Sequence, residues 1–335
     1  LNNSIENLEF EFSKSIFKLV SKKTKKVAFL NGNGQLQDPY LSDINNSLGT
    51  DNNSLSEFFS VNFFDLKDYE LDTDNNPSLS KQLLKIQEFD ALIIAKPTIP
   101  FNELEKFILD QYIMNGGKIL WLIDGVAMDM DSLKNTNAYS TALPLSLNLD
   151  DMMFKYGIRI NSDLIMDLQS DQIPIVVGFN GDIPQRKMFP WVYNPLFIPK
   201  SKHPIVKNLE AIKTSFVSTI DTVKSESVTK YPLLFCSPYS KIVKSPHRVS
   251  LNILNEEPNI KNFNTKEKIA AILLEGKFKS VFENRLTPTS NIKFNKLSPE
   301  NKMIVISDGD IIKNHVTSQG LSYPLGYNHY SKSQY

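Results

Sequence analysis

The sequence predicts an α/β fold with a mostly parallel, doubly wound sheet and an irregular, proline-rich insertion. Two observations lead to this prediction. First, short runs that are apolar along their whole length alternate with helical patterns, which is typical of parallel strands covered by helices on both faces. Second, prolines cluster in the middle of the chain, where each one interrupts regular hydrogen bonding. Connections between the parallel strands are expected to be right-handed.

An amphipathic helix is predicted near the N-terminus, over residues 4–20, with Ser4 as its N-cap. Its apolar residues recur at spacings of three and four, as one face of a helix requires. They are Ile5, Leu8, Phe12, Ile16, Leu19 and Val20. A lysine cluster follows, which we interpret as cations that complement the helix C-terminus; contact with phosphate or lipid is the alternative. The cluster consists of Lys22, Lys23, Lys25 and Lys26.

Four strands and two helices are expected next. Apolar runs predict the strands, and an apolar face or a capping residue predicts the helices. The strands are expected at residues 27–30, 58–64, 90–95 and 118–123, and the helices at residues 78–87 and 102–114. Asn102 is the predicted N-cap of the second helix, and Asn115-Gly116-Gly117 ends it.

The proline-rich insertion is predicted to run from about residue 129 to residue 227, without long helices. Short strands are plausible within it at residues 159–166, 175–179 and 215–220. The prolines are Pro144, Pro174, Pro184, Pro190, Pro195, Pro199 and Pro204.

After the insertion, the alternating pattern resumes. A strand is predicted at residues 232–236, a helix at residues 266–274 and a last buried strand at residues 303–308. The resulting organisation is an N-terminal helix, one α/β domain with its insertion, and a C-terminal tail that reads as a linker; two domains are the alternative. The expected bounds are residues 1–24, 25–315 and 316–335.

Composition and charge exclude several classes of protein. The 335 residues carry 37 basic and 37 acidic side chains, and this zero net charge argues against nucleic-acid binding. A single cysteine, Cys236, cannot close an intrachain disulfide or build a multi-thiolate metal site. The longest apolar runs are strand-sized and too short to span a bilayer. Because the chain begins at Leu1, we expect a fragment, with any membrane anchor outside it.

Polar residues follow several of the predicted strands, where a doubly wound sheet binds its ligands. Asn31 and Asn33 lie in the turn after the first strand, Asp124 follows the fourth, and Asp308 ends the last. We take these four as candidate ligand-binding residues, with structural turns and helix caps as the alternative. The third glycine of a dinucleotide fingerprint is missing, because that position is Gln37. No metal or other cofactor is predicted.

Catalytic patterns are absent from the sequence. There is no Gly-x-Ser-x-Gly motif, and Cys236 lies in an apolar run that predicts a buried, inert thiol. The segment 72–76 begins like a calcium loop, but Pro77 and Leu83 occupy the positions that require Gly and Glu. The four histidines, His203, His247, His315 and His329, follow no metal-binding pattern. The protein is therefore not expected to be an enzyme.

Several segments, taken in order, resemble the auxiliary subunits of ABC transporters. They are Lys26 to Gly34, Gly116 to Asp124, His203 to Val206, Pro232 to Pro238, Ala270 to Phe282 and Met303 to Asp310. The longest of these, AAILLEGKFKSVF, is the most distinctive. Together they are most similar to the GldG type, a gliding-motility-associated ABC transporter component of Bacteroidetes.

This resemblance implies a flavodoxin-like or class I glutamine-amidotransferase-like sheet on the periplasmic side of the bacterial inner membrane. It also implies membrane-spanning helices outside this fragment, and an ABC permease and its ATPase as partners. The chain departs from the amidotransferase pattern, because Asp124-Gly125 stands where the nucleophilic cysteine would be. It also has Asn33 and Gln35 where the family's turn often carries a His and an acidic residue.

The leading hypothesis is a non-enzymatic accessory domain of an ABC transporter linked to gliding motility or secretion, acting through protein–protein contacts. The alternative is a receptor for a sugar, peptide or lipid fragment at the carboxyl edge of the sheet. A degenerate hydrolase or amidotransferase relative is the third hypothesis.

Overall fold

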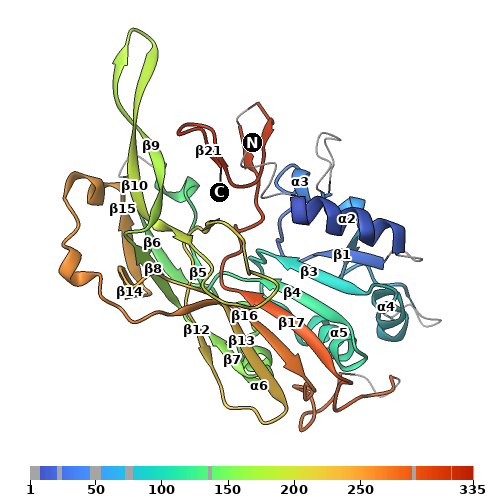
Figure 1. The fold of residues 1–335 in the computed structure, drawn as a ribbon. Helices are drawn as coiled ribbons and strands as arrows, with labels where there is room; N and C mark the ends of the chain where they lie inside the picture. The colour runs from blue at the N-terminus through green and yellow to red at the C-terminus, as the bar shows by residue number, and fades with distance from the viewer. Residues whose placement is uncertain are drawn as a thin grey trace.

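Nine strands form one central mixed sheet in the computed structural model, which describes residues 8–20, 25–45, 54–71, 78–134, 138–288, 292–317 and 319–334. The strand order is β2-β1-β3-β4-β17-β16-β12-β7, and β13 pairs with β16 (Figure 1). The first five of these strands run parallel, whereas β16 is antiparallel to β17, β13 and β12. The large, mostly parallel sheet of an α/β fold is thereby confirmed.

The bounds of the sheet strands agree with most of the apolar runs. They are β1 (Lys25–Asn31), β2 (Phe59–Asp65), β3 (Ala91–Ala95), β4 (Lys118–Leu122), β7 (Ile158–Ile160), β12 (Ile220–Thr222), β13 (Val228–Phe235), β16 (Ile269–Gly276) and β17 (Asn301–Ile306). Consecutive residues of β1, from Val27 to Leu30, are all buried, as strands covered on both faces require. The strands predicted at residues 27–30, 58–64, 90–95, 118–123, 232–236 and 303–308 are confirmed.

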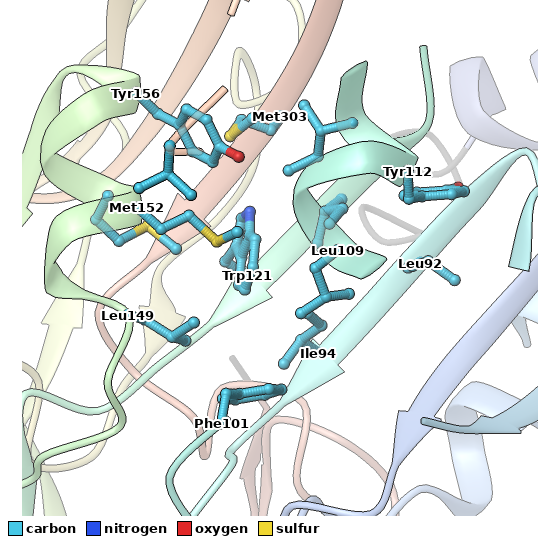
Figure 2. Packing of buried hydrophobic residues seen from close by; sticks show 14 of the residues in the cluster. Leu92, Ile94, Phe101, Leu109, Tyr112, Trp121, Leu149, Met152, Tyr156 and Met303 are labelled. Atoms are coloured by element: carbon cyan, nitrogen blue, oxygen red, sulfur yellow. The ribbon is translucent and has the colours of Figure 1, made fainter. Parts of the chain in front are cut away.

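Helices cover one face of the sheet. They are α4 (Leu79–Ile86), α5 (Glu103–Met114) and α6 (Asp150–Tyr156), and they share one hydrophobic core with the strands. Figure 2 shows Leu109 of α5 and Met152 of α6 on either side of Trp121 of β4. The opposite face is covered mainly by the short α3 (Ser42–Asn45), by loops, and by strands β8 (Asp163–Asp167) and β14 (Ser240–Lys244). The two faces are therefore covered by different kinds of element, and the predicted doubly wound arrangement, with helices covering both faces alike, is wrong in this respect.

The start of α5 shows why the sequence folds as it does there. The Oδ1 atom of Asn102 accepts a hydrogen bond from the Glu105 backbone N–H at 2.9 Å, and Glu105 Oε2 accepts one from the Asn102 N–H at 2.9 Å. This reciprocal capping satisfies two donors that a helix N-terminus otherwise leaves unpaired. The helix ends at Asn115-Gly116-Gly117, where Gly116 has φ +93°. Both predicted ends of α5 are confirmed.

The N-terminal helix α2 (Leu8–Val20) is confirmed, but its apolar stripe is exposed. It contacts the protein through a Lys14–Glu57 ion pair at 3.2 Å and through Phe17, whose ring lies 6.1 Å from that of Phe58. The exposed residues of the stripe are Leu8, Phe12, Ile16, Leu19 and Val20. In the described part of the chain, no helix is long and apolar enough to cross a membrane.

The predicted helix at residues 266–274 is wrong, because this segment forms β16. Its alanines and leucines favour a helix when they are considered alone. In the folded protein the segment is sandwiched between β17 and β13. Ile272 and Leu274 pack in the core that holds the helices, whereas Ala271 and Leu273 pack in the core of the opposite face. Burial on alternating sides is a property of strands, and it overrides the helical propensity.

The insertion consists mainly of strands and has no long helix among its described residues, as predicted, but two of these strands, of 11 and 15 residues, are longer than expected. The strands expected at residues 159–166 and 175–179 correspond to β7 with β8 and to part of β9, whereas residues 215–219 are not a strand. The other strands that precede the C-terminal tail are β5 (Val126–Ala127), β6 (Tyr139–Pro144), β9 (Ser170–Asn180), β10 (Ile183–Phe197), β11 (Ile212–Lys213) and β15 (His247–Ser250).

The C-terminal tail packs against the protein instead of leaving it as a linker. It contains the short strands β18 (His315–Val316), β19 (Ser322–Tyr323), β20 (Tyr327–Asn328) and β21 (Ser333–Gln334). The Leu325 N–H donates to Asp43 Oδ2 at 2.6 Å, and Asn328 Nδ2 donates to Asp171 at 3.1 Å. The linker interpretation failed because it rested on composition alone, which does not report such contacts. The predicted Ser4 cap, Lys22, Lys23 and the rejected calcium loop lie outside the described residues.

Candidate functional site

A cluster of charged side chains lies at the carboxyl edge of the sheet, where β3, β4 and β17 end. Lys96 follows β3, Asp124 follows β4, and Asp308 and Asp310 follow β17. The Lys96 Nζ atom lies 2.9 Å from Asp124 Oδ2 and 2.5 Å from Asp310 Oδ2. Since the ends of neighbouring parallel strands meet at one edge, residues far apart in the sequence form one ionic cluster there.

Backbone N–H groups hold the carboxylates of the ionic cluster in place. Gly309 donates to Asp124 Oδ1 at 2.6 Å, Asp310 donates to Asp308 Oδ1 at 2.8 Å, and Ser215 donates to Asp308 Oδ2 at 2.8 Å. Asp308 is fully buried. The hydrogen bond from Ser215 reaches outside the strand ends, because Ser215 belongs to the insertion. The ionic cluster therefore connects the insertion to the central sheet.

The pKa values of Lys96, Asp124 and Asp308 are all raised, that of the lysine by the neighbouring carboxylates and those of the two aspartates mainly by burial. Burial opposes the charge of Lys96, but the carboxylates of Asp124 and Asp310 outweigh it and raise the pKa of Lys96. Burial raises the pKa of Asp124 although Lys96 lowers it. Burial, together with the charges of Asp310 and Asp124, raises the pKa of Asp308 well above its usual value. Lys96 thus stays protonated while Asp308 resists ionisation.

A cleft of about 550 Å³ adjoins the ionic cluster. It is lined by residues 208–215, by residues after β17 and by the C-terminal tail at residues 324–327. Asp310 belongs to both the cleft and the ionic cluster, and Lys313 forms an ion pair with it at 3.3 Å. His315 also lines the cleft, and burial, followed by the charge of Lys213, lowers its pKa. The volume falls in the usual range of small-molecule sites.

The four predicted site residues do not form one site. Asp124 and Asp308 meet in the ionic cluster, which agrees with their expected position at the carboxyl edge. Asn33 is buried elsewhere, where its Nδ2 donates to Glu105 Oε2 at 2.9 Å and to the Pro100 carbonyl at 3.3 Å. It therefore ties the first turn to the start of α5. Among the described residues, no hydrogen bond or ion pair joins Asn31 or Asn33 to the ionic cluster.

Lys96 is the member of the cluster that sequence reasoning missed. It directly follows the third predicted strand, in the same position as Asp124 after the fourth. A search for polar residues immediately after every buried strand would have found it, whereas the search for known catalytic and metal motifs did not. The described residues contain no group of three or more His, Cys, Asp or Glu side chains arranged to hold a metal ion.

A larger, more open groove of about 1150 Å³ lies along α6, β7, β12 and β14. Several of the charged side chains that line this groove already form ion pairs with one another. Arg285 contacts Asp151 at 2.5 Å, and Arg159 contacts Asp221 at 3.4 Å. The smaller cleft is the stronger candidate despite its size, because it adjoins the ionic cluster and the carboxyl edge of the sheet.

Cys236 is buried, as predicted. Burial raises the pKa of its thiol, and its sulfur accepts hydrogen bonds from Ser240 Oγ at 3.2 Å and from the Lys268 N–H at 3.1 Å. A reactive cysteine needs an accessible sulfur and a lowered pKa. The thiol is thus a packed core group and not an activated nucleophile.

Comparisons with known proteins agree with the resemblance found in the sequence. A family model described as "ABC-type uncharacterized transport system" matches residues 24–335. A curated protein of Borreliella burgdorferi is 26% identical over 294 residues, which cover 86% of this chain and 52% of that protein. The chain therefore spans about half the length of this curated relative.

A solved structure titled "mmIFT52 N-terminal domain" superposes with a TM-score of 0.44 at 12% identity, covering 86% of this chain and 88% of that one. A likeness this weak carries no argument about fold or function. The family match confirms the resemblance to ABC transporter auxiliary components, whereas the narrower GldG type stays a prediction. Because the family model covers nearly the whole chain, the protein belongs to this family of auxiliary components of ABC-type transport systems.

Proposed function

We propose that this chain is a non-enzymatic, extracytoplasmic accessory domain that acts by contacting the permease of an ABC transporter, whose ATPase completes the assembly. The observation that carries the proposal is the family match over residues 24–335. The proposed location is the periplasmic side of a bacterial inner membrane, with membrane-spanning helices outside these residues. A role in gliding motility or secretion belongs to the same proposal and rests on the GldG resemblance.

The geometry supports a role without catalysis. At the carboxyl edge, the ammonium group of Lys96 is held between Asp124 and Asp310, and therefore it is not available as a nucleophile. Cys236 is buried with a raised pKa. These two groups would be the natural candidates for covalent chemistry on a sheet of this kind, and both are engaged in packing or ion pairs.

The test is affinity capture of the full-length protein from membranes in mild detergent, followed by mass spectrometry. We expect an ABC permease and its ATPase to co-purify in near-equal amounts. An unrelated membrane-anchored domain carrying the same tag is the control for nonspecific recovery. Recovery of the protein without either subunit would overturn the proposal of a stable complex.

A second candidate function is a receptor for a sugar, peptide or lipid fragment. The observation that favours it is the cleft of about 550 Å³ beside Asp310 and Lys313. A ligand that binds the folded state raises its apparent stability, so a thermal-shift screen of these three ligand classes is a direct test. Stabilisation that disappears in the Lys313→Met variant would support the cleft as the site. A screen without any stabilised condition would count against a receptor.

A further inference from the structure

Strands β9 and β10 form a long two-stranded hairpin that projects away from the rest of the protein (Figure 1). We call residues 173–189 of this hairpin the arm. Among the described residues, the hairpin's only further strand pairing is with β11 at Leu196 and Phe197, at its base. A Cβ placed on Gly181, in the connecting turn, would meet no atom within 4 Å. The end of the arm therefore stands in open space.

The end of the arm is apolar. The exposed fractions are 45% for Val176, 57% for Val177, 70% for Phe179 and 71% for Ile183. Contiguous exposed apolar side chains of this kind mark interaction sites in soluble domains. An isolated two-stranded hairpin is also only marginally stable in water, so a partner that covers it removes an unfavourable exposure.

These apolar side chains lie on both faces of the arm. Phe179 pairs with Pro184, and the next residue, Asn180, pairs with Ile183. Because consecutive residues of a strand point to opposite faces, Phe179 and Ile183 project in opposite directions. A flat partner surface could cover only one of them. The arm therefore fits a slot whose two walls contact both faces at once.

The base of the arm is held firmly. Trp191 and Tyr193 of β10 are buried in the core. Asp171, at the start of β9, is fully buried; it forms an ion pair with Lys213 at 2.6 Å and accepts a hydrogen bond from Asn328 Nδ2. This anchoring fixes the direction in which the arm projects, and less conformational freedom is lost when a partner binds.

The charge of the arm indicates the chemistry of its partner. Arg186 and Lys187 are both exposed; Arg186 pairs with Val176 at the inner limit of the apolar end and lies 5.9 Å from the ring centre of Tyr330. Asp182 in the turn is the arm's one acidic residue. The basic pair is complementary to an acidic rim around the slot. Asp182 at the apex opposes insertion into lipid, since a charge is costly in the hydrocarbon region. The occupant is therefore a protein surface and not the bilayer.

We infer that the arm is the element through which this protein docks on the transporter's membrane subunit, in an apolar slot with an acidic rim on its extracytoplasmic surface. This inference rests on the proposed function. Within the arm, no other strand of the described residues pairs with the outer edges of β9 and β10, and a partner strand that hydrogen-bonds to either edge would add a second contact.

The experiment places a photo-crosslinking phenylalanine derivative at position 179 in the full-length protein, in membranes that contain the whole transporter. The matched control places it at position 260, because Ile260 is a similarly exposed residue outside the arm, at 65%. We expect a crosslink to the membrane subunit, identified by mass spectrometry, from position 179 and not from position 260. The double variant F179E/I183E should reduce capture of that subunit about tenfold, and Ile260→Glu should not reduce it.

The outcomes distinguish a failure of the inference alone from a failure of the proposed function. If the wild-type protein and F179E/I183E capture the transporter equally well, the arm is not the docking element, although the proposed function stands. If the wild-type protein captures no transporter subunit, both fail. A crosslink from position 179 to a second copy of this chain, or Phe179-dependent binding to protein-free phosphatidylglycerol vesicles, would overturn the inference in favour of that other occupant. Unchanged circular dichroism and thermal midpoints would show that the variants are folded.

Discussion

Gly309 passes so close to Lys96 that a Cβ at position 309 would lie 2.7 Å from the Lys96 Cβ atom. Lys96 itself has φ +52°, in the left-handed region that residues other than glycine seldom adopt. The two residues follow β17 and β3, so they meet at the carboxyl edge. The ammonium group of the same Lys96 contacts Asp124 and Asp310. The backbone conformation at Lys96 and the close approach of Gly309 therefore help to define the geometry of the ionic cluster.

The first prediction concerns this contact. Gly309→Ala should lower the free energy of unfolding by about 1–3 kcal/mol, because the added methyl group overpacks the site. Urea unfolding at neutral pH measures the change. Gly178→Ala is the control, because a Cβ there would have Gln185 Oε1, at 3.8 Å, as its nearest neighbour among the described residues. The effect of this substitution should stay within about 0.5 kcal/mol. If Gly309→Ala and Gly178→Ala lowered the free energy of unfolding equally, the contact between Gly309 and Lys96 would not be tight.

The second prediction is that Lys96→Met destabilises the protein by about 3–5 kcal/mol at neutral pH, because it leaves buried carboxylates without their counter-ion. Chemical denaturation of both proteins gives the difference. Lys134→Met breaks an exposed ion pair with Asp131 and should change stability by less than about 1 kcal/mol. A loss for Lys96→Met no larger than that of the control would mean that solvent already screens the cluster.

The third prediction concerns pH. The pKa of Asp308 is raised in the folded state by burial and by Asp310 and Asp124, from an ordinary value of 3.8. The folded state then binds the proton more tightly than the unfolded state. This group's contribution to the free energy of unfolding is therefore present at low pH and falls as the pH rises above about 4. As the pH rises above about 4, the free energy of unfolding of Asp308→Asn should therefore increase relative to that of the wild-type protein.

Asp131→Asn provides a control of opposite sign. The hydrogen bond with Lys134 lowers the pKa of Asp131, and the stabilisation by this group is present above the unfolded value and lost as the pH falls. Asp131→Asn should thus lose stability relative to the wild-type protein as the pH rises. Urea unfolding at a series of pH values measures both slopes. The same slope for both variants would contradict the pKa direction assigned to Asp308.

The fourth prediction tests the role of Asn33. Asn33→Ala removes the donor that contacts Glu105 and the Pro100 carbonyl, both next to the start of α5. We expect a loss of about 1–3 kcal/mol, because a buried carboxylate is left with fewer partners. Thermal or urea unfolding measures it. The Oδ1 atoms of Asn31 and Asn33 both lack a hydrogen-bond partner among the described residues, but only the Nδ2 atom of Asn33 donates hydrogen bonds there, so Asn31→Ala should be nearly neutral. The reverse order of effects would place the structural role on Asn31.

The parallel half of the sheet could be predicted from the sequence because its strands are buried on both faces. Such strands have continuous apolar runs, as β1 and β3 do. The cap at Asn102 could also be predicted, because its partner Glu105 is only three residues away. Local signals of this kind need no knowledge of the rest of the fold.

The candidate site was predicted only in part. Asp124 and Asp308 were found because each follows a predicted strand, but Asn33 was assigned to the same edge site on the same argument and lies in a different network. Position after a strand specifies the edge of the sheet and not the direction of the side chain. The missing member, Lys96, carries no motif, and its role depends on two carboxylates that are 28 and 214 residues away in sequence.

The sequence by itself determined the α/β class, the ends of α5 and the buried, unreactive environment of Cys236, because each depends on neighbouring residues. Only the tertiary structure decided that residues 269–276 form a strand, that Lys96 joins two aspartates, and that Phe179 and Ile183 project from an arm. These features depend on which segments pack together. Burial between two sheet neighbours overrides helical propensity, and Coulomb attraction acts between groups that only folding brings within reach.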